Sequence, residues 1–177
     1  MRPARHPGEK RIVKWLPQPR ALFALSLIVP CALVAFAVML TTVYQVAACP
    51  LCIVQRMLYL VIAVAALFGA ALASEPGVRV FAALLQMIIA AAGAAIAGYQ
   101  IYLQQHPFSA SCGDGSSWWE RLVEQAGQLI PLLFKAEGLC SESTWPLFGI
   151  SIVEWSALAF AGLFIFGLMT LFAQSRR

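Results

Sequence analysis

The sequence predicts an all-α membrane protein, a four-transmembrane-helix bundle with a long outer loop that contains a short amphipathic helix. Of its 177 residues, 61% are hydrophobic and only 11% are charged, whereas a soluble domain has about 45–50% apolar and about 25% charged residues. A helix needs about 20 apolar residues to cross a bilayer, and four long stretches of this chain carry no charged side chain. These stretches are Ala21–Ala48, Met57–Ser74, Val80–Gln105 and Trp155–Ser175.

The uncharged stretches divide the chain into a basic segment and one membrane domain. We expect the basic segment over residues 1–20 and a single domain over 21–175. The expected spans are about 21–46, 52–74, 79–104 and 148–173, and the expected outer loop is about 105–147. A cleavable signal peptide is the alternative for the first span. A signal peptide has an apolar region of only about 7–15 residues, much shorter than this uncharged stretch, so we favour a span.

The positive charges lie at the two ends of the chain. The net charge is +4, half of the Lys and Arg residues fall within residues 1–20, and Arg176 and Arg177 close the chain. By the positive-inside rule, both termini then face the cytoplasm, as an even number of spans requires. Charges grouped in this way suit contact with the lipid bilayer. They do not form a face for nucleic acid, which we do not expect as a partner.

The predicted topology places four of the five cysteines on the outer side of the membrane. Cys49 and Cys52 lie at the outer junction of the first two spans, and Cys112 and Cys140 lie in the long outer loop. In a bacterium that side is the oxidising periplasm, where disulfides persist. Cys31 falls in the middle of the first span, where we expect a small buried hydrophobic residue.

The Cys49-Pro50-Leu51-Cys52 segment leads directly into the second span, so the cysteine pair should occupy the first turn of a helix. Proline is favoured at that position, and the helix N-terminus stabilises a thiolate. A disulfide across so short a loop gains little stability, which suits electron transfer. Arg56 lies one turn further on, so its guanidinium can reach the Cys52 sulfur or an anion beside it. Contact with lipid headgroups is the alternative for this arginine.

The two loop cysteines lie in small, polar surroundings, which predict exposed segments. A disulfide between Cys112 and Cys140 would close a long loop and stabilise the protein by about 3–4 kcal/mol in the entropic model. A purely structural role is therefore an alternative for this pair.

Between the loop cysteines, apolar residues follow helical spacing and predict a short amphipathic helix. Such a helix can lie in the membrane interface, and packing against the protein itself is the alternative. Pro131 should end or kink it. The apolar positions are Trp119, Leu122, Val123, Ala126, Leu129, Ile130 and Leu133.

The run from Cys49 to Arg56, Cys-Pro-Leu-Cys-Ile-Val-Gln-Arg, resembles the signature of the DsbB family of disulfide bond formation proteins. Cys112 followed by Gly113, and the Gly-Leu-Cys-Ser-Glu segment at 138–142, resemble the second cysteine pair of that family. The resemblance covers about residues 20–172. It implies an enzyme of the bacterial inner membrane, a protein-dithiol:quinone oxidoreductase.

The resemblance also implies an electron relay. Cys112 and Cys140 would form the disulfide that oxidises a periplasmic DsbA-like protein of the thioredoxin fold, with Cys112 taking the mixed disulfide. Cys140 would then exchange with Cys49. Cys52, released as a thiolate beside Arg56, would pass the electrons to the membrane quinone pool, as ubiquinone or menaquinone. A lipid-soluble acceptor also suits the residues themselves, because the sequence contains no haem-attachment motif, flavin fingerprint or cluster of metal ligands.

One expected feature of the family is absent. Members often carry arginine or histidine near the outer end of the third helix, close to the quinone, but residues 95–105 contain neither. His106 is the nearest candidate for quinone binding, and a polar loop residue is the alternative.

Two other functions compete with a thiol oxidase. Four cysteines could bind zinc, but zinc sites usually repeat close pairs, and an oxidising compartment opposes free thiolates. We therefore expect no metal. The second is a non-catalytic membrane protein or transporter whose loops are stapled by disulfides. It would need neither Arg56 nor a bound quinone, and the spans contain no pair of charges that would mark an ion path.

Overall fold

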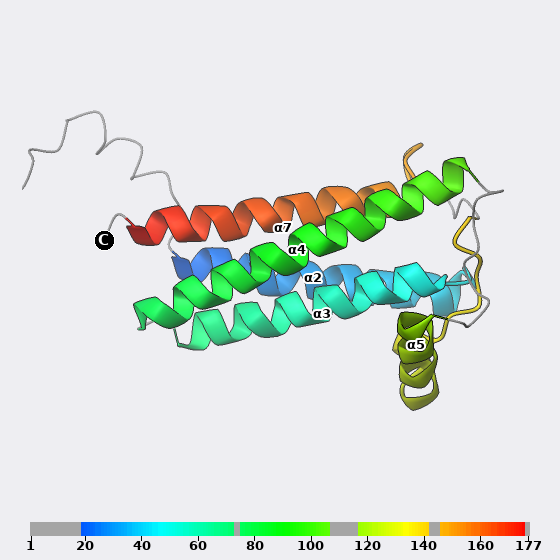
Figure 1. Ribbon diagram of the computed structural model, residues 1–177, viewed down its shortest axis with the longest axis horizontal. Coiled ribbons are helices and arrows are strands. Elements are labelled where there is room, and N and C mark those ends of the chain that lie inside the picture. Colours follow the sequence, from blue (N-terminus) through cyan, green and yellow to red (C-terminus); the bar gives the residue numbers. More distant parts are fainter. Residues whose placement is uncertain (1–18, 73–74, 107–116, 142–145, 176–177) are drawn as a thin grey trace, which may run out of the picture.

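The computed structural model describes residues 19–72, 75–106, 117–141 and 146–175, and this part of the chain is helical without a β-strand. Four long helices run beside one another, α5 lies across one end of them, and α6 is a single turn (Figure 1). All four long helices are apolar enough to cross a membrane, which confirms the predicted fold class. The helices are α2 (Pro19–Val43), α3 (Pro50–Ala71), α4 (Pro76–Gln105), α5 (Trp118–Leu129), α6 (Pro131–Phe134) and α7 (Ile152–Ser175).

Several ends of the long helices lie a few residues from the expected positions, and two of these ends lie where the backbone leaves helical geometry. Helix α2 ends at Val43, before Gln45, which has a φ of 53°. Helix α7 begins at Ile152 because the preceding turn contains Phe148 and Gly149, with φ values of 55° and 80°. A positive φ is incompatible with a right-handed helix, so both connections are longer than hydropathy alone predicts.

A capping box fixes the start of α7. The amide of Ser151 donates to a carboxylate oxygen of Glu154 at 2.7 Å, and the amide of Glu154 donates to the hydroxyl of Ser151 at 3.2 Å. These reciprocal bonds satisfy two amides that the first helical turn leaves without partners. Glu154, the only charged residue of α7, therefore caps the first turn, at the end of the helix.

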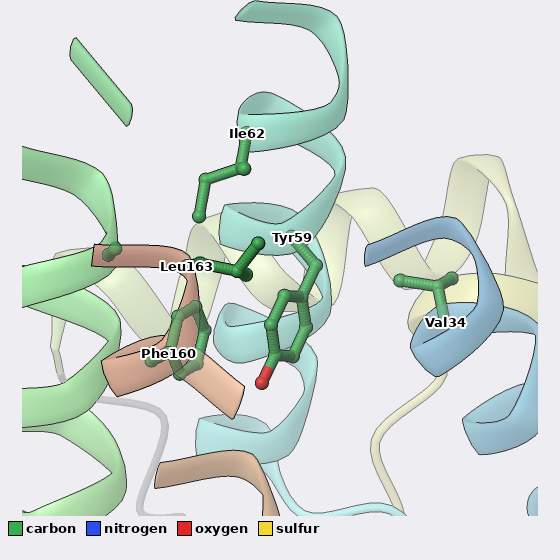
Figure 2. Packing of buried hydrophobic residues seen from close by; sticks show 6 residues of the cluster. Val34, Tyr59, Ile62, Phe160 and Leu163 are labelled. Atoms are coloured by element: carbon green, nitrogen blue, oxygen red, sulfur yellow. The ribbon is translucent and has the colours of Figure 1, made fainter. Parts of the chain in front are cut away.

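Helices α2, α3, α4 and α7 all contribute to the main apolar core. Figure 2 shows the centre of this core, where Phe160 of α7 lies against Tyr59 of α3. The two rings are stacked, with centroids 4.1 Å apart and planes 2° apart. The cluster consists of Val34, Tyr59, Ile62, Ala90, Phe160 and Leu163.

The remaining helix surface is apolar and exposed, as a lipid-facing surface should be. Only 28% of the most apolar window of α2 is buried within the protein. Cys31 lies on the exposed part of this helix, so the expectation that it is buried is wrong. A helix at the side of a small bundle contacts its neighbours along one face only, and a thiol on the other face is apolar enough for lipid.

Inside the bundle, a buried amide links three helices. The Gln86 side chain of α4 donates to the Ser26 hydroxyl of α2 at 3.0 Å and to the Leu163 carbonyl of α7 at 2.8 Å. Polar groups in a bilayer find their partners within the protein. Gln86 therefore acts as an interhelical connection between oxygen acceptors.

Helices α4 and α7 approach closely at Gly93, which leads to a prediction about stability. A methyl group at this position would overlap the ring of Phe160, which is completely buried and stacked on Tyr59. Overpacking of a tight core costs about 1–3 kcal/mol. We therefore expect Gly93→Ala to lower the melting temperature of the purified protein in detergent, followed by circular dichroism.

Gly98→Ala is the matched control, because nothing lies within 4 Å of the added methyl group on the same helix. Equal melting temperatures for the two variants would contradict the close packing of α4 on α7.

Candidate active site

The start of α3 positions the first cysteine pair. Cys49 is the N-cap residue, with extended backbone angles, and its sulfur accepts a hydrogen bond from the amide of Cys52 at 3.3 Å. Pro50 occupies the first turn, as predicted. The two sulfurs are 2.8 Å apart, with the Cys49 thiol donating to Cys52. A sulfur thus takes the capping position that an oxygen of Ser, Thr or Asp usually occupies.

Cys140 lies against Cys49. The two side chains are 1% and 3% exposed and share a buried cluster with Leu51 and Leu103. Hydrogen bonds of the Cys49 thiol with Cys140 and then with Cys52, followed by burial, raise the pKa of Cys49 above its ordinary value. Within the pair, the Cys49 thiol is therefore the hydrogen-bond donor and the Cys52 sulfur is the acceptor.

Backbone hydrogen bonds hold the Cys140 segment in this place. The amides of Glu137 and Gly138 both donate to the carbonyl of Ala48, at 2.9 and 3.0 Å. A Cβ atom at Gly138 would lie only 2.7 Å from the carbonyl oxygen of Ala47. A glycine is therefore needed for the two segments to approach so closely.

A cavity of about 490 Å³ lies beside Cys52, between α2, α3 and α7. Its size is in the range of small-molecule sites, and apolar side chains form most of its lining. The polar groups in its wall are few and include Cys52, Gln55 and Arg56. Cys49 is not among the lining residues, so the two cysteines of the pair face different surroundings.

Arg56 is buried in the wall of this cavity. Its side chain is 7% exposed, and its two terminal nitrogens donate to the carbonyls of Leu133 and Ala37, each at 3.1 Å. The guanidinium thus connects α3 with α6 and α2. These hydrogen bonds go to backbone carbonyls and not to the Cys52 sulfur, and the buried position does not suit the alternative of headgroup contact.

Sequence reasoning missed Gln100 of α4. Its amide nitrogen donates to the sulfurs of both Cys49 and Cys52, each at 3.1 Å, and its side chain is 2% exposed. Only its position could have indicated it, because an uncharged polar residue interrupts the apolar run of a predicted span. A search for arginine or histidine at this end of the helix passes over it.

The structure does not bring His106 to the cavity. His106 ends α4 in an exposed position, with its ring stacked on Tyr102 at a centroid distance of 4.4 Å. It is not among the residues that line the cavity, and its quinone role stays a prediction. Cys112 lies outside the described residues. Within the described ranges, no group of three His, Cys, Asp or Glu side chains is arranged to hold a metal ion.

Helix α5 covers this end of the bundle. The sequence left two alternatives for it, packing against the protein and a position in the membrane interface, and its surface has features of each. Val123 is buried against Ile53 and Ala48 beside Trp119. Trp118 and Leu129 are 74% and 82% exposed. One side thus packs against the protein, and another presents apolar residues outward. Ile130 interrupts the helix before Pro131, as predicted.

A buried dithiol at the start of a membrane-length helix, with a third cysteine on one side and an apolar cavity on the other, defines a membrane thiol–disulfide oxidoreductase. The family model for Disulfide bond formation protein DsbB matches residues 19–170. The chain therefore belongs to the DsbB family, as the resemblance of its motif predicts. It is a multi-pass membrane protein of disulfide bond formation.

Individual relatives agree with the family model. Disulfide bond formation protein B of Dechloromonas aromatica is 35% identical over 159 residues, which cover 89% of this chain and 94% of the relative. Disulfide bond formation protein B 1 of Pseudomonas fluorescens is 37% identical over 147 residues, with 82% and 85% covered. Disulfide bond formation protein B of Burkholderia thailandensis is 38% identical over 148 residues, with 82% and 85% covered.

The close approach at Gly138 leads to a prediction about the contact between Cys140 and Cys49. In a chain with Cys31, Cys52 and Cys112 replaced by serine, Cys49 and Cys140 are the remaining thiols, and a mild oxidant should join them rapidly. Gly138→Ala should slow this reaction about tenfold, because a clash worth about 1–3 kcal/mol would push the Cys140 segment away. Mass spectrometry of quenched samples measures the rate.

Gly77→Ala serves as the control, since nothing lies within 4 Å of its added methyl group. If Gly138→Ala reacted as fast as this control, the Cys140 segment would not depend on the close backbone approach.

Proposed function

We propose that this protein is an inner-membrane thiol oxidase. It reoxidises a periplasmic DsbA-like dithiol protein and passes the electrons through Cys112/Cys140 and Cys49/Cys52 to a membrane quinone, ubiquinone or menaquinone. The observation that supports the proposal is that the two cysteines of the first pair have different neighbours. Cys49 contacts Cys140 of the outer loop, whereas Cys52 lines the apolar cavity.

The relay begins with two thiol–disulfide exchanges. A thiolate of the soluble partner attacks the Cys112–Cys140 disulfide, which gives a mixed disulfide on Cys112 and releases Cys140 as a thiolate. Cys140 then attacks Cys49 in the Cys49–Cys52 disulfide and releases Cys52 as a thiolate. The buried contact between Cys140 and Cys49 favours this second attack, because the two reacting atoms are already held together.

The remaining exchanges return the loop pair to its oxidised state. The second thiol of the partner resolves the mixed disulfide and leaves oxidised with one disulfide. Cys112, now a thiolate, attacks Cys140 in the Cys49–Cys140 disulfide, so that the Cys112–Cys140 disulfide forms again and Cys49 becomes a thiol. The Cys49/Cys52 pair now holds the two electrons and, with uptake from solvent, the two protons that the partner lost.

The cavity fits a quinone head group. It is large enough, apolar, open to Cys52, and bordered by the fixed positive charge of Arg56. A bound quinone would accept two electrons and two protons and leave as the quinol. The dithiol closes to the Cys49–Cys52 disulfide as it gives them up. Arg56 favours the negative charge on the Cys52 sulfur during this step, because a charge in a poorly hydrated wall is weakly screened.

The charges and the shape of the bundle support the proposed orientation. The start of α2 and the end of α7 lie at one end of the bundle, and α5 lies at the other (Figure 1). Basic residues at both termini support a cytoplasmic location for the first of these ends. The cysteine pair at the start of α3 would then face the periplasm, where a soluble thioredoxin-fold partner reaches the outer loop.

Replacement of Arg56 tests the quinone step. Arg56→Met keeps an apolar stem but removes the charge and both hydrogen bonds to carbonyls. Loss of charge-assisted bonds worth about 1.5–3 kcal/mol corresponds to a decrease of about 10- to 100-fold in kcat/KM for quinone. We expect a slower quinone reduction and a higher KM. Arg56→Lys should recover only part of the activity, because an ammonium group lacks the planar fork.

The control is Arg121→Met on the exposed side of α5, which should leave quinone kinetics unchanged. Quinone kinetics of wild-type quality in a folded Arg56→Met protein would exclude this arginine from the quinone step. A wild-type protein that fails to oxidise any dithiol protein with quinone would favour the alternative of a disulfide-stapled membrane protein or transporter.

Replacement of Cys140 tests the order of the relay. In Cys140→Ser, the free Cys112 thiol attacks the disulfide of the oxidised partner and frees the partner's second thiol. Only that thiol, and no longer Cys140, can then resolve the mixed disulfide. We therefore expect a covalent complex with the partner to accumulate on a non-reducing gel, and to be lost when Cys112 is also replaced. Trapping on Cys49, with Cys112 dispensable, would contradict the proposed order.

A further inference from the structure

A continuous chain of buried hydrogen bonds ends on the two sulfurs of the first cysteine pair. The Tyr59 hydroxyl is 2.8 Å from the Ser156 hydroxyl, which donates to Oε1 of Gln55 at 2.6 Å. Nε2 of Gln55 donates to Oε1 of Gln100 at 2.8 Å. Nε2 of Gln100 then donates to both sulfurs at 3.1 Å. Three helices, α3, α4 and α7, contribute to this chain.

The orientations of the side-chain amides give the chain one direction, from Ser156 to the sulfurs. A serine hydroxyl has a single hydrogen, and Ser156 gives it to Gln55. Tyr59 is therefore the donor to Ser156, whose hydroxyl and carbonyl oxygens lie 2.8 and 3.1 Å from the Tyr59 oxygen. The side-chain oxygen of Gln55 accepts the hydrogen bond from Ser156. The NH₂ group of Gln55 therefore points towards Gln100. If the amide of Gln100 were reversed, two NH₂ groups would face each other and an oxygen would face the sulfurs. From Ser156 to Gln100, every donor therefore points towards the cysteine pair.

Gln100 differs in its acceptors from the other buried glutamine of the same helix. Gln86 donates to a hydroxyl and a carbonyl, which are good acceptors and explain it as an interhelical connection. Gln100 donates to two sulfurs, and a neutral thiol is a weak acceptor. A thiolate is a much stronger one, because hydrogen bonds to an ionised acceptor are about twice as strong. The position of Gln100 is thus favourable mainly when a sulfur carries negative charge.

We propose that Gln100 is a catalytic residue that binds the Cys49 and Cys52 sulfurs and stabilises the thiolate of the reduced pair. Gln55 and Ser156 are positioning residues that keep its NH₂ group turned towards the sulfurs. Each donor in a chain polarises the next, so the effect of Ser156 reaches the sulfurs although it touches neither of them. The proposal rests on the proposed function in taking Cys49/Cys52 as the pair that is reduced and reoxidised.

The test measures the cysteine pair without quinone or partner protein. In full-length protein with Cys31, Cys112 and Cys140 replaced by serine, the Cys49/Cys52 pair is equilibrated with a dithiol redox buffer. Because Gln100 stabilises the reduced pair, Gln100→Leu should shift this equilibrium about tenfold towards the disulfide, a reduction potential about 30 mV lower. The rate of Cys52 alkylation at neutral pH should fall about tenfold as the thiolate becomes rarer.

Two further variants separate thiolate binding from a structural role. Gln86→Leu removes a buried amide of the same helix and should leave both the equilibrium and the alkylation rate at wild-type values. Ser156→Ala removes one hydroxyl, should fold, and should shift both quantities in the same direction as Gln100→Leu by about two- to threefold.

Wild-type values in Gln100→Leu, or equal shifts in Gln100→Leu and Gln86→Leu, would overturn the role of Gln100. A Ser156→Ala protein identical to wild type would overturn the positioning role of the chain. Because no quinone takes part, these results are independent of quinone reduction by the wild-type protein, which tests the proposed function separately.

Discussion

The sulfur of Cys49 is an atom on which four interactions meet. It caps α3 by accepting from the amide of Cys52, it donates to the Cys52 sulfur, it contacts Cys140, and it accepts from Gln100. Helix geometry, loop docking and sulfur chemistry therefore depend on one position. A change that moves this atom affects the start of the helix and the contacts with Cys52 and Cys140 together, so these features cannot be adjusted separately.

Much of the fold could be predicted because a bilayer imposes a simple rule on sequence: long uncharged stretches become helices. Positions where this rule failed have local causes, such as the positive φ of Gln45 and Phe148. In the site, spacing within one helix is enough to identify Cys49, Cys52 and Arg56. Gln100 could not be identified in this way, because its partners lie on another helix and no local pattern records a contact between helices.

The two buried glutamines of α4 show how similar residues take different roles in a membrane. The side-chain amide of each is hydrogen-bonded, as an apolar environment requires. Each also connects α4 with neighbouring helices. They differ in their distance from the cysteines, and therefore in their acceptors. Arg56 both connects helices and borders the candidate site. Its side chain on α3 donates to carbonyls of α6 and α2, and its charge lies beside the cavity.

The burial of Cys49 and Cys140 also protects these two sulfurs kinetically. Thiol–disulfide exchange requires direct approach of one sulfur to another, and these two side chains are only 3% and 1% exposed. A small soluble thiol must displace the segment around Gly138 before it can attack either sulfur. Small reductants in the surrounding solution are thereby kept away from these two sulfurs while that segment stays in place.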